Sequence, residues 1–192
     1  LVDIELRYSK LGGIGWATYT HAYVVVTDLD GSKTVFRAGP SASPGFSGTS
    51  SASGGASNGS SGSRSSASDS SNSSSPGSAA GGPGKSTGPF GRIETTQQPY
   101  VPGAADWEES PYASQKLLSN NDPAKAYLDK LADYSNLVDA ANVPYNPFTQ
   151  NSNSYAHQAI KSLELSRPSA PVWAPANGVN LVELPTKNEK GK

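Results

Sequence analysis

The chain of 192 residues contains no cysteine and no methionine, and it has only two histidines. Without cysteine it forms no disulfide and no thiolate metal site, which fits an oxidising or a reducing compartment equally well. Two histidines far apart in the sequence argue against a zinc site. We therefore expect no metal and no cofactor. The missing methionine and the start at Leu1 predict that the chain is released from a longer polypeptide.

Strong charge and long hydrophobic runs are also absent. The formal net charge is −1, which favours neither nucleic acid nor an anionic membrane surface as a partner. The apolar runs are far shorter than the ~18 residues that a membrane-spanning helix needs. These two absences predict a protein with no nucleic-acid partner and no membrane span.

Residues 41–89 consist almost entirely of serine, glycine, alanine and proline. Such a segment buries too little apolar surface to offset its ordering entropy, so we expect it to be disordered. The part before it is too small to fold alone, which predicts one domain over residues 1–192 that this tract interrupts. Loop closure costs only ~0.6 kcal/mol per doubling of length, so such an insertion is tolerable. An engineered linker is the alternative origin of the tract.

A period of two over Val2–Tyr8, and short apolar stretches elsewhere, predict the strands. The expected strands are Val2–Tyr8, Thr18–Thr27, Lys33–Arg37 and Gly91–Thr96. The second and third should form a hairpin, because Asp30-Gly31 suits a tight turn. Leu11–Trp16 is expected to be a flexible loop, and Gly39-Pro40 should end the third strand.

Apolar residues at three-and-four spacing predict the helices. Asp122 should cap the first, with Pro123 at its first position. A second helix is expected over Ser152–Leu165 and a short third over Ser114–Ser119, followed by a non-helical proline-rich tail. The predicted fold is α+β: an antiparallel sheet with two to three helices packed on one side, interrupted by the disordered insertion.

The motif Asn151-Ser152-Asn153-Ser154 stands at the start of the second helix. One interpretation is a helix cap, because asparagine and serine cap helices well. The other is chemical: a nucleophile at a helix N-terminus feels the positive end of the dipole, and nearby N–H groups hold an oxyanion. His21, at the start of an apolar strand, would then be the general base.

Other polar and aromatic residues favour structural interpretations. His157, inside the second helix, is expected to be a packed or solvated side chain. The three tryptophans Trp16, Trp107 and Trp173 are expected to anchor the packing. The acidic residues Asp106, Glu108 and Glu109 are expected to lie in a solvated loop.

The segments His21–Val26 and Asn151–Tyr155 resemble the circularly permuted papain-like superfamily, which is related to NlpC-type peptidases and lecithin:retinol acyltransferase. In that superfamily a histidine-bearing strand precedes an Asn-Cys-x-x-aromatic motif on a helix. Phe36–Pro40 and Tyr145–Pro147 also resemble bacterial members with an Asn-Ser-Asn-Ser motif.

The resemblance implies Ser152 as the nucleophile, next to Asn151, and His21 as the base. Thr34 and Arg37 are the candidates for the polar residue that orients His21. Serine stands where the superfamily has cysteine, and a hydroxyl ionises far less readily than a thiol. A natural serine enzyme, a binding module derived from the fold, and an engineered Cys→Ser substitution all fit this departure.

The expected function is that of a hydrolase or acyl/amide transferase with a covalent Ser152 intermediate. Peptidoglycan, protein side-chain amides and lipids are the candidate substrates. The resemblance implies a toxin effector domain, secreted or delivered from a bacterium, with an immunity or carrier protein as partner. The alternative is a non-catalytic binding or surface-display module.

Overall fold

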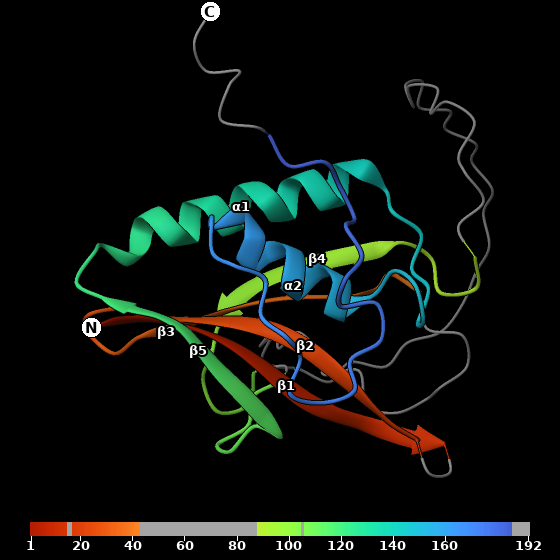
Figure 1. Cartoon of the computed structure of the whole chain (residues 1–192), viewed down its shortest axis with the longest axis horizontal. Coiled ribbons are helices and arrows are strands. Elements are labelled where there is room, and N and C mark those ends of the chain that lie inside the picture. Colours follow the sequence, from red (N-terminus) through yellow and green to blue (C-terminus); the bar gives the residue numbers. More distant parts are fainter. Residues whose placement is uncertain (15–16, 43–87, 105, 186–192) are drawn as a thin grey trace, which may run out of the picture. The chain divides into compact units, whose positions relative to one another are not determined.

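The computed structural model describes residues 1–14, 17–42, 88–104 and 106–185, and the described part is an α+β fold (Figure 1). One antiparallel sheet has the strand order β4-β3-β2-β1-β5, and two helices pack on one of its faces. The elements are β1 (Val2–Ile14), β2 (Ala17–Thr27), β3 (Lys33–Pro40), β4 (Ile93–Pro99), β5 (Ala113–Asn120), α1 (Ala124–Ala141) and α2 (Ser152–Ser162). The predicted fold class is confirmed.

The predicted insertion lies between two paired strands. Most of it, residues 43–87, falls outside the described residues. β3 and β4 pair from Thr34 opposite Pro99 to Pro40 opposite Ile93. Beyond that pair, Ser41 N donates to Arg92 O at 2.9 Å. The chain therefore leaves and re-enters the described part at one end of a strand pair, which is consistent with an insertion.

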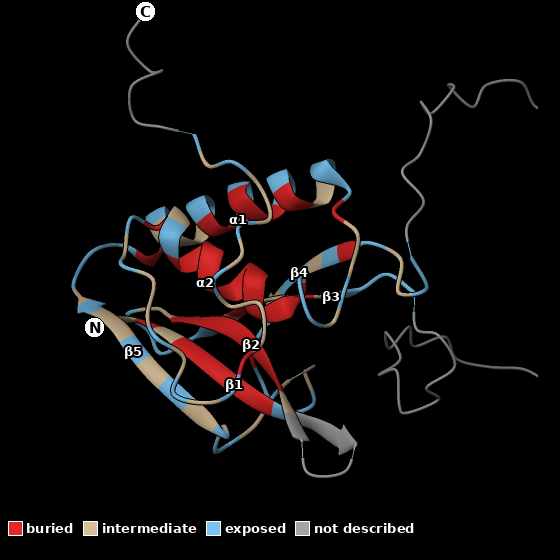
Figure 2. Cartoon of the chain, turned by 45° about the vertical axis from the view of Figure 1, so that its right-hand side comes forward, coloured by how far each residue is buried: buried red, intermediate tan, exposed pale blue. Residues whose placement is uncertain are grey.

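The two faces of the sheet are buried by different partners. One face carries Val2, Ile4, Leu6, Tyr8, Ala22, Val24 and Val26, which pack with α1 and α2 in the main core. The other face carries Tyr23, Val25 and Val35, and Tyr100 from the β4–β5 connection packs on them. Figure 2 shows buried residues running along β1, β2 and α2. Alternation along β2 thus places His21 and Tyr23 on the face away from the helices.

The first hairpin is longer than predicted. β1 pairs with β2 from Asp3 opposite Thr27 to Leu11 opposite Tyr19, and after an irregularity Ile14 pairs with Ala17. The expectation of a flexible loop over Leu11–Trp16 was therefore wrong for residues 11–14, while residues 15 and 16 lie outside the described residues. A ladder already formed continues cheaply, and the glycines before Ile14 tolerate the irregularity.

Two other strand predictions need correction. The short helix expected over Ser114–Ser119 is instead β5, which pairs with β1 from Val2 opposite Asn120 to Tyr8 opposite Ala113. Hydrogen bonding along the otherwise free edge of β1 outweighs the weak local preference for helix. β3 also continues through Gly39 and Pro40 instead of ending before them, because β4 pairs with both.

Both long helices were predicted, with differences at their ends. Pro123 is the N-cap of α1, and no side chain caps it. The predicted cap, Asp122, instead accepts hydrogen bonds from Asn120 Nδ2 and Tyr127 OH. α2 begins at Ser152 as predicted but ends at Ser162. The left-handed φ of +65° at Glu164 explains why it does not reach Leu165. The tail is non-helical, as expected, through residue 185.

Candidate functional site

Asn151 is the cap of α2, as the structural interpretation of the motif predicted. Its Oδ1 accepts from the N–H groups of Asn153 at 2.9 Å and Ser154 at 3.2 Å. In return the Ser154 hydroxyl accepts from Asn151 N at 3.3 Å, which completes a capping box. The Asn151 Nδ2 donates to Pro147 O and Pro175 O at 2.6 and 3.2 Å. Asn151 therefore holds the helix start and two neighbouring segments.

Asn153 joins the start of α2 to the strand that carries His21. Its Oδ1 accepts from Ala22 N at 2.9 Å, and its Nδ2 donates to Thr20 O at 3.2 Å. These two backbone groups flank His21, beyond the last β2–β3 pair at Val24 and Phe36. Asn153 is 1% exposed, so its amide replaces the missing strand partner at this edge. The start of α2 is thereby fixed to the β2 backbone on both sides of His21, at the strand edge between the helix-covered face and the face that carries the His21 side chain.

Ser152 is the member of the motif that makes no such bond. The Ser154 hydroxyl donates to Ala176 O at 2.9 Å, so Asn151, Asn153 and Ser154 all hold neighbouring segments. The Ser152 hydroxyl makes no hydrogen bond in the described part of the chain, although the residue is only 2% exposed. It is the one side chain of the motif that the fold does not use as a donor or acceptor.

The capping bonds also decide which N–H groups are open at the helix start. Those of Asn153 and Ser154 are taken by the Asn151 side chain, and Tyr155 N donates to Asn151 O at 3.1 Å. The Ser152 N–H makes no hydrogen bond within the described ranges. The several oxyanion donors expected from the sequence therefore reduce to the N–H of Ser152 itself at this helix start.

Asp106 contacts His21, which corrects the expectation that it lies solvated with Glu108 and Glu109. The His21 Nε2 is 3.0 Å from Asp106 Oδ2, and the Asp106 side chain is 15% exposed. Arg37 Nε lies 2.7 Å from the same oxygen. The residue that orients His21 is thus Asp106, from the connection between β4 and β5. No spacing in the sequence pointed to it, because the contact spans 85 residues.

The two sequence candidates for the orienting residue have different outcomes. Arg37 belongs to the cluster, but it contacts Asp106 and acts on His21 through it. Thr34 pairs with Val26, which is about 16 Å along β2 from His21 at the rise of a strand. Thr34 is therefore ruled out as the direct partner of His21.

The charges of this cluster identify which His21 nitrogen is free. Burial raises the pKa of Asp106, but the hydrogen bond with His21 and the electrostatic interactions with His21 and Arg37 outweigh it, so the pKa falls below its ordinary value. An ionised carboxylate only accepts hydrogen bonds, so His21 Nε2 is the donor. The lone pair of neutral His21 is then on Nδ1, the atom available as a base.

His157 is a packed side chain, as expected. It is fully buried in α2, and its Nε2 lies 2.8 Å from Tyr8 OH. Burial is the main cause that lowers the pKa of His157 from 6.5 to about 4, and the positive charge of Arg167 adds to it. His157 is therefore neutral at physiological pH.

His157 predicts how stability depends on pH. In the unfolded chain it binds a proton below about pH 6.5, and in the fold only near pH 4, so stability is lost as pH falls between these values. The loss from this group by pH 4.5 should be about 2.5 kcal/mol. In His157→Gln, whose amide still reaches Tyr8, urea unfolding at pH 7.5 and 4.5 should show a loss smaller by that amount. Equal losses of stability in the wild type and in His157→Gln would contradict the lowered pKa of His157.

Two tryptophans expected to anchor the packing are on the surface. Trp107 is 36% exposed and Trp173 is 54% exposed, while Trp16 lies outside the described residues. The Trp173 ring lies 5.2 Å from the Tyr19 ring, and Phe148, 60% exposed, lies 6.1 Å from Tyr19 on another side. Tyr19 and Phe148 are close in sequence to His21 and Ser152, so exposed aromatic rings border the place where α2 meets β2.

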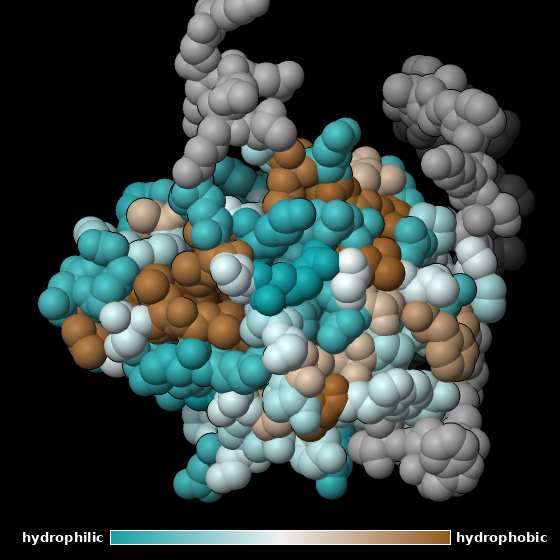
Figure 3. All heavy atoms as spheres, in the orientation of Figure 1, coloured by the Kyte–Doolittle hydropathy of each residue, from teal (hydrophilic) through white to brown (hydrophobic). Residues whose placement is uncertain are grey.

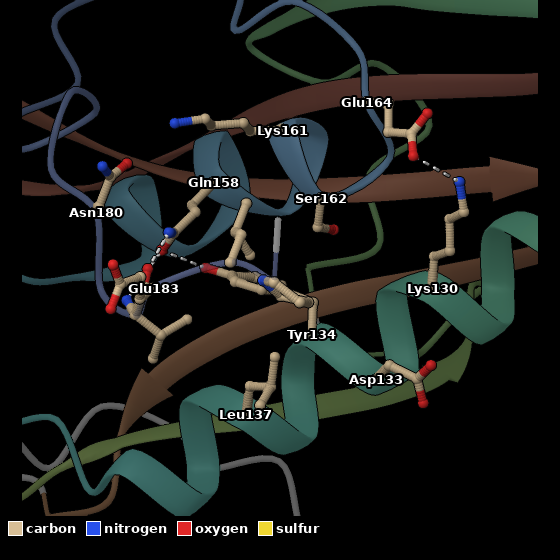
Figure 4. Close-up of a pocket in the computed structure, with 13 residues that line it drawn as sticks. Lys130, Asp133, Tyr134, Leu137, Gln158, Lys161, Ser162, Glu164, Asn180 and Glu183 are labelled. Carbon is tan, nitrogen blue, oxygen red and sulfur yellow. Dashed lines mark hydrogen bonds and ion pairs between the residues drawn. The ribbon is translucent and has the colours of Figure 1, made fainter. Parts of the chain in front are cut away.

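A hollow of about 740 Å³ lies elsewhere, between α1, α2 and the tail (Figure 4). Tyr134 OH donates to Gln158 Oε1 at 3.2 Å on its wall, and Lys130 pairs with Glu164 at 3.8 Å near its rim. Figure 3 shows hydrophobic residues reaching the surface in patches on this face of the molecule. Neither Ser152 nor His21 lines the hollow, so it is separate from the candidate site.

Among residues 1–14, 17–42, 88–104 and 106–185, no group of three or more histidine, aspartate or glutamate side chains is arranged to hold a metal ion. Neither α1 nor α2, the helices of the described ranges, has the length and apolar character needed to cross a bilayer.

Comparison with known proteins returned no match to any family model, to any curated protein or to any solved structure. The resemblance to the permuted papain-like superfamily therefore rests on the motifs around His21 and Ser152.

Proposed function

We propose that the chain is a hydrolase or acyl/amide transferase that acts through a covalent intermediate on Ser152. The observation that carries the proposal is the difference in side-chain hydrogen bonding among the four residues of the motif. Asn151, Asn153 and Ser154 bond to surrounding segments, whereas the Ser152 hydroxyl is left without a partner in the described part of the chain. A serine hydroxyl at a helix start that the fold uses for no bond is available to react.

The mechanism assigns each group a proton or a charge. His21 Nδ1 removes the proton of Ser152 Oγ while the oxygen attacks a carbonyl carbon, and the Ser152 N–H stabilises the oxyanion. The leaving amine or alcohol takes the proton from His21 as the acyl-enzyme forms. Water or a second acceptor then attacks the acyl carbon while His21 takes its proton, the bond to Ser152 Oγ breaks, and His21 returns the proton to Ser152. Asp106 stays ionised and stabilises the imidazolium throughout.

Serine needs more activation than cysteine does, and two features of the site bear on the charges that form during the reaction. The Asp106 carboxylate is mostly buried, so its negative charge acts on His21 with little screening. The start of α2 adds a positive potential at residue 152, which favours the developing oxyanion.

One observation favours the alternative, a non-catalytic binding or display module. Ser152 is 2% exposed, so a substrate carbonyl has little access to it unless neighbouring segments move. The exposed rings of Phe148 and Trp173 would suit a binding surface as well as a substrate cleft. The wider setting of the proposal, a secreted bacterial effector, follows from the family resemblance.

A fluorophosphonate probe tests the proposal without knowledge of the substrate. We expect the purified protein to gain the mass of one probe less HF, mapped by peptide analysis to Ser152, because only an activated serine displaces the fluoride. Ser152→Ala should abolish labelling. Ser162→Ala, at the other end of the same helix, should leave it intact. Labelling that persists in Ser152→Ala, or no labelling of the wild type, would favour the binding module.

A further inference from the structure

Asp106 reaches His21 from an unusual backbone conformation. Its φ is +60°, in the left-handed region that residues other than glycine rarely adopt. Such a conformation persists only where the surroundings impose it, and it often marks a functional site. The His21 and Arg37 contacts fix the Asp106 side chain. Another contact must fix the backbone.

The Tyr100 hydroxyl makes that contact. The hydroxyl accepts from Glu108 N at 3.0 Å. Its single proton is shared between two carbonyl oxygens, Asp106 O at 3.1 Å and Glu108 O at 3.3 Å. One phenol therefore bonds to both ends of the turn at residues 106–108. These three contacts come from a side chain that is 5% exposed, so water replaces them poorly.

Tyr100 is itself fixed to the sheet in three ways. Its backbone N donates to Lys33 O at 2.8 Å, and the Arg7 guanidinium lies 5.3 Å from its ring centroid. Its hydroxyl is 3.3 Å from that of Tyr23, a fully buried residue. The Tyr23 ring in turn stacks on His21, with centroids 6.0 Å apart. The same tyrosine pair thus contacts His21 on one side and the backbone of its carboxylate partner on the other.

We propose that Tyr100 is a positioning residue of the candidate site: its hydroxyl, supported by Tyr23, holds the 106–108 turn so that the Asp106 carboxylate meets His21 Nε2. The expected effect of Tyr100 on catalysis rests on the proposed function. Its expected effect on the His21 tautomer does not, because the Asp106 carboxylate selects which His21 nitrogen carries the proton.

Tyr100→Phe is the sharpest variant, because it keeps the backbone bond and the ring contacts and removes only the hydroxyl. The ¹⁵N shifts of His21 report which nitrogen is protonated. In the wild type we expect a proton on Nε2. In Tyr100→Phe we expect a mixture of the two tautomers, and a fluorophosphonate labelling rate lower by roughly tenfold to a hundredfold. Asp106→Asn should change the His21 shifts in the same direction.

Tyr112→Phe is the matched control. Tyr112 lies in the same connection, is 46% exposed and contacts only Lys10 among the described aromatic and charged pairs. It should keep the wild-type His21 shifts and labelling rate. Tyr100→Phe with wild-type His21 shifts, while Asp106→Asn changes them, would overturn the proposal, even if thermal stability fell. If the wild type is not labelled at all, the proposed function fails, and the nitrogen shifts still decide the role of Tyr100.

Discussion

Asn153→Ala is expected to destabilise the protein by about 3 kcal/mol or more. The change removes three hydrogen bonds at a residue that is 1% exposed. It leaves Ala22 N, Thr20 O and Pro175 O without their partner, and an unsatisfied buried backbone group costs about 1–3 kcal/mol. The measurement is the midpoint of urea unfolding at pH 7, with the slope of the transition unchanged.

Asn136→Ala provides the control for that experiment. Asn136 is exposed on α1, so the same substitution should change stability by less than about 0.5 kcal/mol. If Asn153→Ala costs no more than Asn136→Ala, the start of α2 is not held to β2 as described. The spatial relation between Ser152 and His21 would then lose its main support.

Ser152→Cys is expected to create a thiol activated by His21. The chain has no cysteine, so this variant carries a single thiol and alkylation reports on it alone. A thiol at a helix N-terminus beside a histidine has a lowered pKa and is largely thiolate at neutral pH, whereas an ordinary thiol with a pKa near 8.5 is only a few per cent thiolate. We expect iodoacetamide to react at pH 6.5 roughly tenfold faster than in the double variant Ser152→Cys/His21→Gln.

Comparison of Ser152→Cys with the double variant cancels the effect of limited access of iodoacetamide to the thiol, because both proteins carry the thiol at the same buried position. Ser162→Cys, at the other end of α2, should react equally fast with or without His21→Gln. A rate for Ser152→Cys that does not depend on His21 would show that the two residues do not form a nucleophile and base pair.

Local signals were enough to predict the parts of the fold that local chemistry determines. The turn at Asp30-Gly31 fixed the β2–β3 hairpin, and the capping preference of Asn151 fixed the start of α2. Ser114–Ser119 was mistaken for a helix because its strand character depends on the free edge of β1, more than a hundred residues earlier in the chain.

The candidate site was predicted in the same uneven way. Arg37 was a sequence candidate for orienting His21, and it contacts Asp106, the residue that meets His21. Asp106 was missed because it is brought to His21 by a proline-rich connection that Tyr100 joins to the face of the sheet away from the helices. The bonds of Asn153 to the backbone on both sides of His21 could not be predicted from the sequence. Nothing in the motif distinguishes the residues that bond to neighbouring segments from Ser152, whose hydroxyl makes no bond.

The central claim is that His21, oriented by Asp106, activates Ser152. The most direct test is the rate of fluorophosphonate labelling at Ser152 in the wild type and in His21→Gln, with folding checked by circular dichroism. Loss of a general base typically lowers the rate by 10²–10⁴-fold, so we expect a fall of at least about a hundredfold. Equal labelling rates in two folded proteins would contradict the account.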